Sequence, residues 1–108
     1  MSVNDDGTLS GAQCRAARAL TDISRAMLAD ASGIDENVIL DFERKIETPG
    51  DDTRKALRQA LETLGALFIP DDAHGGKGVR LKFNAMETAE IEALENEGGT
   101  AAEDDVAR

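Results

Sequence analysis

The most constraining feature of the chain is residues 24–43, SRAMLADASGIDENVILDFE, in which two short segments with apolar periodicity flank a single glycine. Ser24 and Asp35 each precede one of these segments, and both residue types cap the N-termini of helices. Gly33 lies between the segments and suits the left-handed conformation that often follows a helix end. The pattern therefore predicts two short helices, one over residues 25–32 and one directly after Asp35, joined by a tight turn.

Two further helices are expected around this pair. Ser10 is a good N-cap for a first helix, which ends near Thr21. A loop that contains Pro49 precedes a fourth helix, which we expect Asp51 or Asp52 to cap and a glycine at position 65 to end. The apolar side chains expected on the buried faces of the four helices are Leu9, Cys14, Ala17, Leu20, Leu28, Ala31, Val38, Ile39, Phe42, Ala56, Leu57, Ala60, Leu61 and Leu64.

After the fourth helix the spacing of the apolar residues changes. Residues 66–70 are a short apolar run that ends in proline, and residues 79–83 alternate between apolar and basic side chains, as in a half-exposed strand. Turn-forming residues separate the two segments, so a β-hairpin is predicted. Residues 86–97 predict a helix, and the glycine-rich and acidic residues 98–108 are expected to be disordered.

The composition favours one small domain with an aliphatic core. The chain has 108 residues, of which 41% are hydrophobic and only three are aromatic. No apolar run approaches the roughly 20 residues that a membrane-spanning helix needs, and the polar first residues do not form a signal peptide. The single cysteine, Cys14, falls in an apolar helix and is expected to be buried and reduced. We therefore expect a cytoplasmic protein without a membrane segment.

The predicted elements divide the chain into four parts. Residues 1–8 are expected to be a flexible N-terminus, and residues 9–66 form the helical domain. Residues 67–97 contain the hairpin and the last helix, which carry apolar side chains suited to dimerisation or to a partner. Residues 98–108 form the acidic tail.

The spacing of the two central helices is that of a helix-turn-helix unit, whose second helix can enter the major groove of DNA. Residues 9–83 resemble the XRE/Cro (lambda-repressor-like) family of helix-turn-helix regulators, in particular short bacterial members with a hairpin after the fourth helix. The resemblance implies a mainly α fold, with a four-helix domain followed by a short β-hairpin and a C-terminal helix. It also implies a transcriptional regulator that binds double-stranded DNA. Because one such unit reads about half a site, a homodimer on a short palindromic site is expected.

The resemblance assigns structural and phosphate-contacting roles to individual residues. Arg18 and Glu43 lie where the family carries an arginine and a glutamate that pair, so they are expected to form a structural ion pair. Arg25 begins the second helix, where the family usually has a glutamine close to a DNA phosphate. The full set that matches the regions contacting the DNA backbone is Arg25, Arg44, Lys45, Arg54, Lys55 and Arg58.

The base-reading positions of the family fall on the third helix, at Glu36, Asn37 and Asp41. Asn37 is suited to a bidentate contact with adenine in the major groove. Glu36 or Asp41 can accept a hydrogen bond from the amino group of a cytosine, although each carboxylate also faces nearby phosphates.

The charge of the chain favours an alternative function. The net charge is −10, and bare electrostatics would repel a polyanion. Residues 10–66 carry eight basic and ten acidic side chains, whereas residues 67–108 carry four basic and ten acidic ones. The third helix has no basic residue before Arg44, Leu40 is apolar where an exposed polar residue is common, and Lys45 replaces the usual glycine. The alternative is a protein-interaction module, an antiactivator or adaptor that contacts its partner through the third helix or the acidic C-terminal region.

Catalytic and metal-binding signals are weak. Cys14 and His74 are the only thiol and imidazole, so neither a nucleophilic dyad nor a Cys/His zinc site is expected. The run of residues 75–78, GGKG, lacks the spaced glycines and the following helix of a phosphate loop. We expect no enzymatic activity, no cofactor and no metal.

Overall fold

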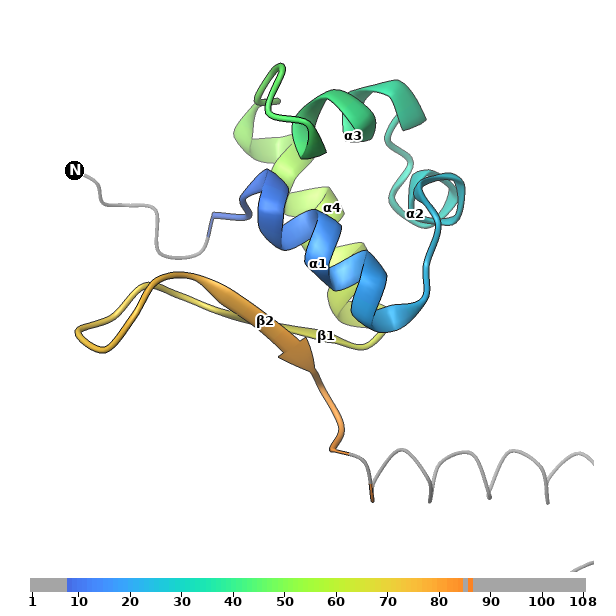
Figure 1. Cartoon of the computed structure of the whole chain (residues 1–108). Helices are drawn as coiled ribbons and strands as arrows, with labels where there is room; N and C mark the ends of the chain where they lie inside the picture. The colour runs from blue at the N-terminus through green and yellow to red at the C-terminus, as the bar shows by residue number, and fades with distance from the viewer. Residues whose placement is uncertain (1–7, 85, 87–108) are drawn as a thin grey trace, which may run out of the picture.

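The described residues form four helices followed by a two-stranded hairpin (Figure 1). The structure is a computed structural model that describes residues 8–84 and residue 86. The predicted helix over residues 86–97, apart from its first residue, and the predicted tail lie outside the described residues, as does the N-terminus before residue 8. The elements are α1 (Gly11–Thr21), α2 (Arg25–Ser32), α3 (Glu36–Glu43), α4 (Asp51–Thr63), β1 (Ala66–Ile69) and β2 (Gly78–Leu81). The expectation of a small, mainly helical domain with a β-hairpin is confirmed.

Side chains cap the first three helices, as predicted. The Ser10 hydroxyl accepts a hydrogen bond from the Gln13 amide at 3.0 Å, and the Gln13 side chain accepts one from the Ser10 amide, which completes a capping box. Ser24 caps α2 by accepting a hydrogen bond from the Met27 amide, and Asp35 caps α3 by accepting one from the Asn37 amide. Gly33 follows α2 with φ 76°, so the left-handed turn between α2 and α3 forms where the sequence indicated.

The start of α4 differs from the prediction. Its N-cap is Gly50, which has no side chain to offer, so the expectation that Asp51 or Asp52 caps the helix was wrong. Both aspartates instead lie in the first turn, where the positive end of the helix dipole stabilises a carboxylate. Gly65 follows the end of α4 with φ 118°, in agreement with its predicted role.

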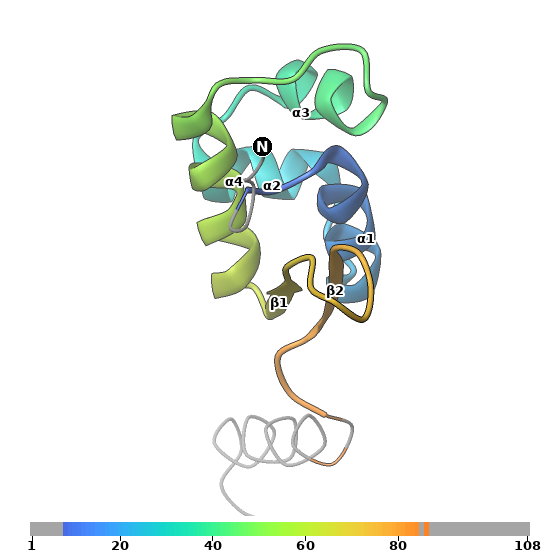
Figure 2. The same cartoon turned by 90° about the vertical axis from the view of Figure 1, so that its left-hand side faces the viewer.

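One core joins the helices and the hairpin. Ala66 and Phe68 of β1 are buried together with residues of all four helices, so the hairpin packs on the helical layer (Figures 1 and 2). The β1 and β2 strands are antiparallel, with Ala66 opposite Leu81 and Ile69 opposite Gly78. The Gln13 side chain, which is buried, donates a hydrogen bond to the Gly78 carbonyl at 2.9 Å and ties β2 to α1. The buried hydrophobic residues are Leu9, Cys14, Ala17, Leu28, Ile39, Phe42, Leu57, Ala60, Leu61, Ala66 and Phe68.

Four side chains expected to face inward are exposed. Ala31 and Leu64 border a shallow depression between α2 and α4. The depression stays open because several side chains that line it, such as Ala31, Ala56 and Ala60, are small. Val38 lies one position from the fully buried Ile39, and a step of one residue turns the side chain away from the core. Leu20, in the last turn of α1, is also exposed and lines a groove against β2.

No helix within residues 8–84 and 86 has both the length and the apolar character needed to cross a membrane.

The N-terminus of α1 approaches the C-terminal end of α3 so closely that only glycine fits. A Cβ atom added to Gly11 would lie 2.2 Å from the carbonyl oxygen of Phe42 and 3.1 Å from its carbonyl carbon. Both are backbone atoms, so a rotamer change cannot relieve the contact. Gly11 therefore fixes how near the two helices come to each other.

We expect Gly11→Ala to lower the free energy of unfolding by about 3 kcal/mol, because the added methyl group forces α1 and α3 apart. Urea denaturation followed by circular dichroism measures the change. Gly75→Ala is the matched control, because nothing lies within 4 Å of a Cβ at that position and its φ is not in the left-handed region. Equal stability losses in the two variants would contradict the close approach.

Candidate nucleic-acid interface

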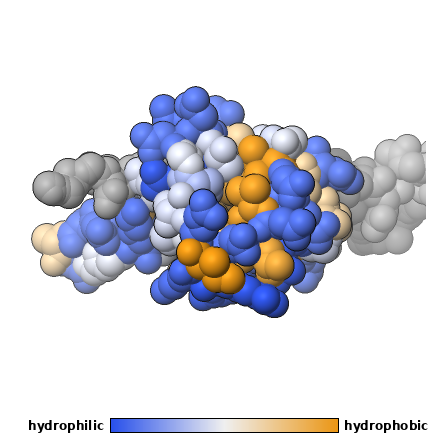
Figure 3. All heavy atoms as spheres, turned by 90° about the horizontal axis from the view of Figure 1, so that it is seen from above, coloured by the Kyte–Doolittle hydropathy of each residue, from blue (hydrophilic) through white to orange (hydrophobic). Residues whose placement is uncertain are grey.

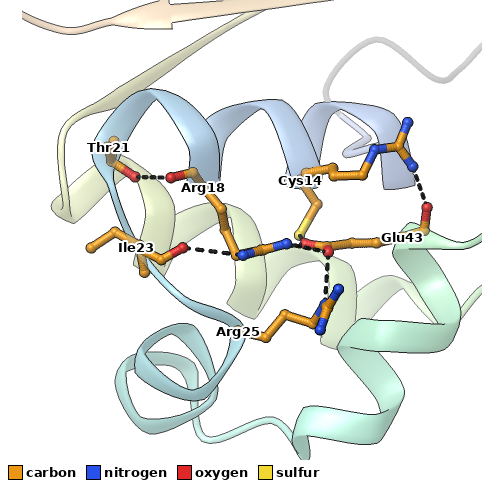
Figure 4. Close-up of polar contacts among 7 residues, drawn as sticks. Cys14, Arg18, Thr21, Ile23, Arg25 and Glu43 are labelled. Atoms are coloured by element: carbon orange, nitrogen blue, oxygen red, sulfur yellow. Dashed lines mark hydrogen bonds and ion pairs between the residues drawn. The ribbon is translucent and has the colours of Figure 1, made fainter.

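Glu43, the last residue of α3, holds α1, α2 and α3 together through one buried carboxylate (Figure 4). Only 1% of its surface is exposed. The Arg18 guanidinium of α1 makes a bidentate contact, with Nε 2.7 Å from Oε2 and Nη2 2.7 Å from Oε1. The ion pair expected between these two residues is therefore present.

The Glu43 carboxylate has two further partners that the sequence did not reveal. The Cys14 thiol donates to Oε2 at 3.1 Å, and the Arg25 Nε donates to Oε1 at 3.1 Å. The Arg15 guanidinium donates to the backbone carbonyl of Glu43. Arg18 also donates to the Ile23 carbonyl at 3.2 Å, which orders the link between α1 and α2. These contacts fix the start of α2 and the end of α3 relative to α1.

The partners of Glu43 keep its carboxylate charged. Burial alone would raise the pKa of Glu43, but hydrogen bonds from Arg18, Cys14 and Arg25 outweigh burial, so the pKa is lowered. The hydrogen bond to Glu43 is the main reason that the pKa of Arg18 is raised. Burial raises the pKa of the Cys14 thiol, which therefore stays protonated and remains a donor. The cluster is thus a stable ion pair with a neutral thiol at neutral pH.

With its C-terminal end fixed in this way, α3 lies at the edge of the domain and presents its outer face to solvent (Figures 1 and 2). Glu36 and Asn37 are exposed and Asp41 is partly buried. Asn37 and Asp41 are four residues apart and therefore lie on the same face of the helix. The structure thus brings the three predicted base-reading residues to the accessible side of α3.

Three of the six predicted phosphate-contacting residues are paired with carboxylates. Arg25 binds Glu43 and keeps one third of its side chain exposed. Arg54 pairs with the Asp51 carboxylate, and its Nε is buried without a hydrogen-bond partner among the described residues. Arg58 pairs with the Glu62 carboxylate at 2.9 Å.

Arg58 also lies over the Phe68 ring, with the guanidinium carbon 5.6 Å from the ring centroid. This contact joins α4 to the hairpin. The other three predicted residues, Arg44, Lys45 and Lys55, are exposed. The six basic side chains therefore do not present six accessible charges.

The chain turns sharply after α3. Lys45 has φ 62°, in the left-handed region that favours glycine, at the position where the resembled family has a glycine. The amides of Ile46 and Glu47 both donate to the Asp41 carbonyl, at 2.8 and 3.3 Å. The turn is therefore held by backbone hydrogen bonds despite an unfavourable side chain at its centre.

Two hollows lie on the surface of the domain near these elements. One, of about 250 Å³, is lined by Val38, Asp41, Glu47, Pro49 and Thr53 between α3 and α4. The other, of about 550 Å³, runs along β2 beside the end of α1 and is lined by Leu20, Val79, Arg80, Leu81, Lys82, Phe83 and Asn84.

Comparison with models of known protein families and with curated protein sequences gave no match.

We expect Glu43→Gln to lower the free energy of unfolding at pH 7 by about 3 kcal/mol, because it leaves Arg18 and Arg25 without a countercharge around a buried group. The pH dependence should change as well. The folded pKa of Glu43 lies below the ordinary value of about 4.3. The contribution of the Glu43 carboxylate to the free energy of unfolding is therefore complete above that value. It is lost as the pH falls through the lowered folded pKa.

Urea denaturation between pH 7 and pH 2.5 measures both effects. The Glu43→Gln variant should lose less stability across this acidic range than the wild type. Glu62→Gln is the control, because its partly exposed pair with Arg58 on one helix contributes about 0.5 kcal/mol. An equal acid sensitivity of Glu43→Gln and the wild type would contradict the role given to this carboxylate.

We expect Lys45→Gly to raise the free energy of unfolding by roughly 1 kcal/mol, since glycine adopts the left-handed conformation without the steric cost that lysine pays. The same denaturation measurement applies. Arg44→Gly is the control, because Arg44 has φ −88° and gains nothing from glycine there. A loss of stability in Lys45→Gly would show that the lysine side chain makes a favourable contact that outweighs the strain.

Proposed function

We propose that the chain is a DNA-binding transcriptional regulator of the lambda-repressor-like helix-turn-helix type. The observation that supports this function is the pair α2 and α3, each capped by a side chain and joined at Gly33. The Glu43 cluster locks this pair against α1 and leaves the outer face of α3 accessible. In helix-turn-helix proteins the second helix of such a pair enters the major groove.

The proposed contacts follow from this placement. Asn37 donates to and accepts from one adenine, and Glu36 or Asp41 accepts from a cytosine amino group. The N-terminus of α2, with the exposed part of Arg25, faces a phosphate. Three more phosphate contacts come from Arg44, Lys45 and Lys55, which are exposed.

A homodimer is part of the proposal. A single unit reads about half a site, and two-fold pairing doubles the contacts with DNA. The groove along β2 supports such pairing, because its apolar side chains are unusually exposed: Leu20 by 42%, Leu81 by 41% and Phe83 by 42%. Burying these side chains against a second copy removes apolar surface from water.

A second candidate function is a protein-interaction module on the same fold. The observation that favours it is the surface beside α3, where exposed Val38 and Ile46 accompany the carboxylates of Glu36 and Asp41. Carboxylates repel the DNA backbone, and exposed aliphatic side chains are typical of protein-binding surfaces.

Titration with labelled DNA distinguishes the two functions. The duplexes are the region upstream of the gene for this chain and a random sequence of the same length, each at 50 and 150 mM salt. Tight binding of the upstream duplex with a steep salt dependence supports the regulator and gives a count of phosphate contacts. No binding of either duplex at low salt overturns DNA binding and favours the protein-interaction module.

Two substitutions test the docking of α3. Asn37→Ala is expected to lose about 1–3 kcal/mol of discrimination at one base pair while binding random DNA as before. Arg44→Ala should weaken binding to every sequence and reduce the salt slope by about one. Fluorescence anisotropy with single-base variants of the bound duplex measures both effects.

Gln59→Ala and Lys77→Ala are the matched controls, because neither residue lies on α3 or lines the groove along β2. Arg25→Ala is expected to weaken binding to all sequences, but it also removes a partner of Glu43, so its stability must be measured alongside. Wild-type behaviour of both Asn37→Ala and Arg44→Ala would exclude this docking.

A further inference from the structure

The turn after α3 displays an isoleucine to solvent in a fixed position. Ile46 is 67% exposed, although isoleucine is among the most frequently buried residue types. Its own amide donates to the Asp41 carbonyl at 2.8 Å, and Glu47 donates to the same oxygen. Backbone hydrogen bonds thus fix the main chain from which this side chain projects into solvent.

A small hollow lies beside this turn. It has a volume of about 250 Å³, and its walls come from Val38 and Asp41 of α3, Glu47 and Pro49 of the turn, and Thr53 of α4. Pockets for small molecules are usually larger, roughly 300–1,000 Å³, and more enclosed. This hollow is of a size to receive one apolar side chain from a partner.

The apolar positions around the hollow are bordered by negative charge. Figure 3, which views the molecule from the side of α3, shows apolar side chains next to hydrophilic ones on this face. Asp41 and Glu47 line the hollow itself. Glu36, at the start of the same helix as Asp41, is exposed. The C-terminal end of α3 adds the negative end of its helix dipole. Arg44 and Lys45 are exposed just before Ile46 but do not line the hollow, so the charges that an inserted segment meets there are those of Asp41 and Glu47.

We propose that the α3–α4 surface, formed by Val38, Asp41, Ile46, Glu47, Pro49 and Thr53, binds a basic segment of another protein. One apolar side chain of that segment fills the hollow against Val38 and Pro49, and a second packs on the exposed Ile46, which precedes Glu47 in the turn. Neighbouring lysines or arginines pair with Asp41 and Glu47. Charge complementarity selects this occupant over an acidic or neutral one. The proposal deepens the second candidate function and does not require the chain to bind DNA.

Occupation of this surface has a consequence for α3. Asp41 belongs both to the α3–α4 surface and to the predicted base-reading face. A partner segment seated there covers part of the helix that would enter the major groove. If the chain binds DNA, the partner and the DNA therefore exclude each other.

A peptide titration tests the proposed surface. The probe is a fluorescein-labelled 14-residue peptide of leucine and lysine, with the leucines spaced to form one helical face, titrated with the full chain at 150 mM salt. The control peptide has the same lysines and serine in place of every leucine. The protein variants are Ile46→Ser and Asp41→Asn, with Met27→Ser, on α2, as the matched control for loss of an exposed apolar side chain elsewhere.

The expected result is that Ile46→Ser and Asp41→Asn each weaken binding about fivefold, whereas Met27→Ser binds as the wild type does. The serine peptide should bind at least tenfold more weakly. The proposal is overturned if the leucine peptide does not bind, if the serine peptide binds equally well, or if Met27→Ser weakens binding as much as Ile46→Ser. Because the assay contains no DNA, its result is independent of whether the chain binds DNA.

Discussion

The structure depends on a single buried carboxylate, Glu43, at which three helices meet. A carboxylate taken out of water without partners would be strongly destabilising. Here Arg18 of α1 and Arg25 of α2 supply positive charge. The Cys14 thiol of α1 supplies a third hydrogen-bond donor. Since α3 ends at Glu43, its final turn cannot move without breaking these contacts. The carboxylate therefore sets the orientation of α3, and with it the face that α3 presents to a partner.

The same end of α3 is constrained by packing. Gly11 allows α1 to approach the backbone of Phe42, one residue before Glu43, and no larger side chain fits between them. Lys45 then takes a left-handed conformation so that the chain can turn back towards α4. Close approach, ion pairing and turn strain thus act within the four residues from Phe42 to Lys45. This combination fixes the orientation of the end of α3, which suits recognition by either DNA or protein.

Local signals were enough to predict most of the fold. Ser10, Ser24 and Asp35 cap helices because their side chains reach amides only two or three residues away, and Gly33 adopts a conformation that few other residues tolerate. The pairing of Arg18 with Glu43 followed from the family resemblance rather than from any local pattern. Contacts between distant segments were missed, because sequence spacing alone says nothing about which helix faces meet. Among the missed contacts are those of Gly11 with Phe42 and of Cys14 and Arg25 with Glu43.

The distribution of paired charges bears on which function α3 serves. Counting basic residues overstates the attraction to DNA, since Arg25, Arg54 and Arg58 are each bound to a carboxylate of the chain. Glu36, Asp41 and Glu47 lie among the accessible cations near α3, so the net attraction to phosphate is weaker than the cations alone would give. Base contacts must then supply the rest of the affinity for DNA, and they demand a well-matched site. A basic protein segment, in contrast, can pair with Asp41 and Glu47 in the hollow, which Arg44 and Lys45 do not line, and can pack on the exposed Ile46.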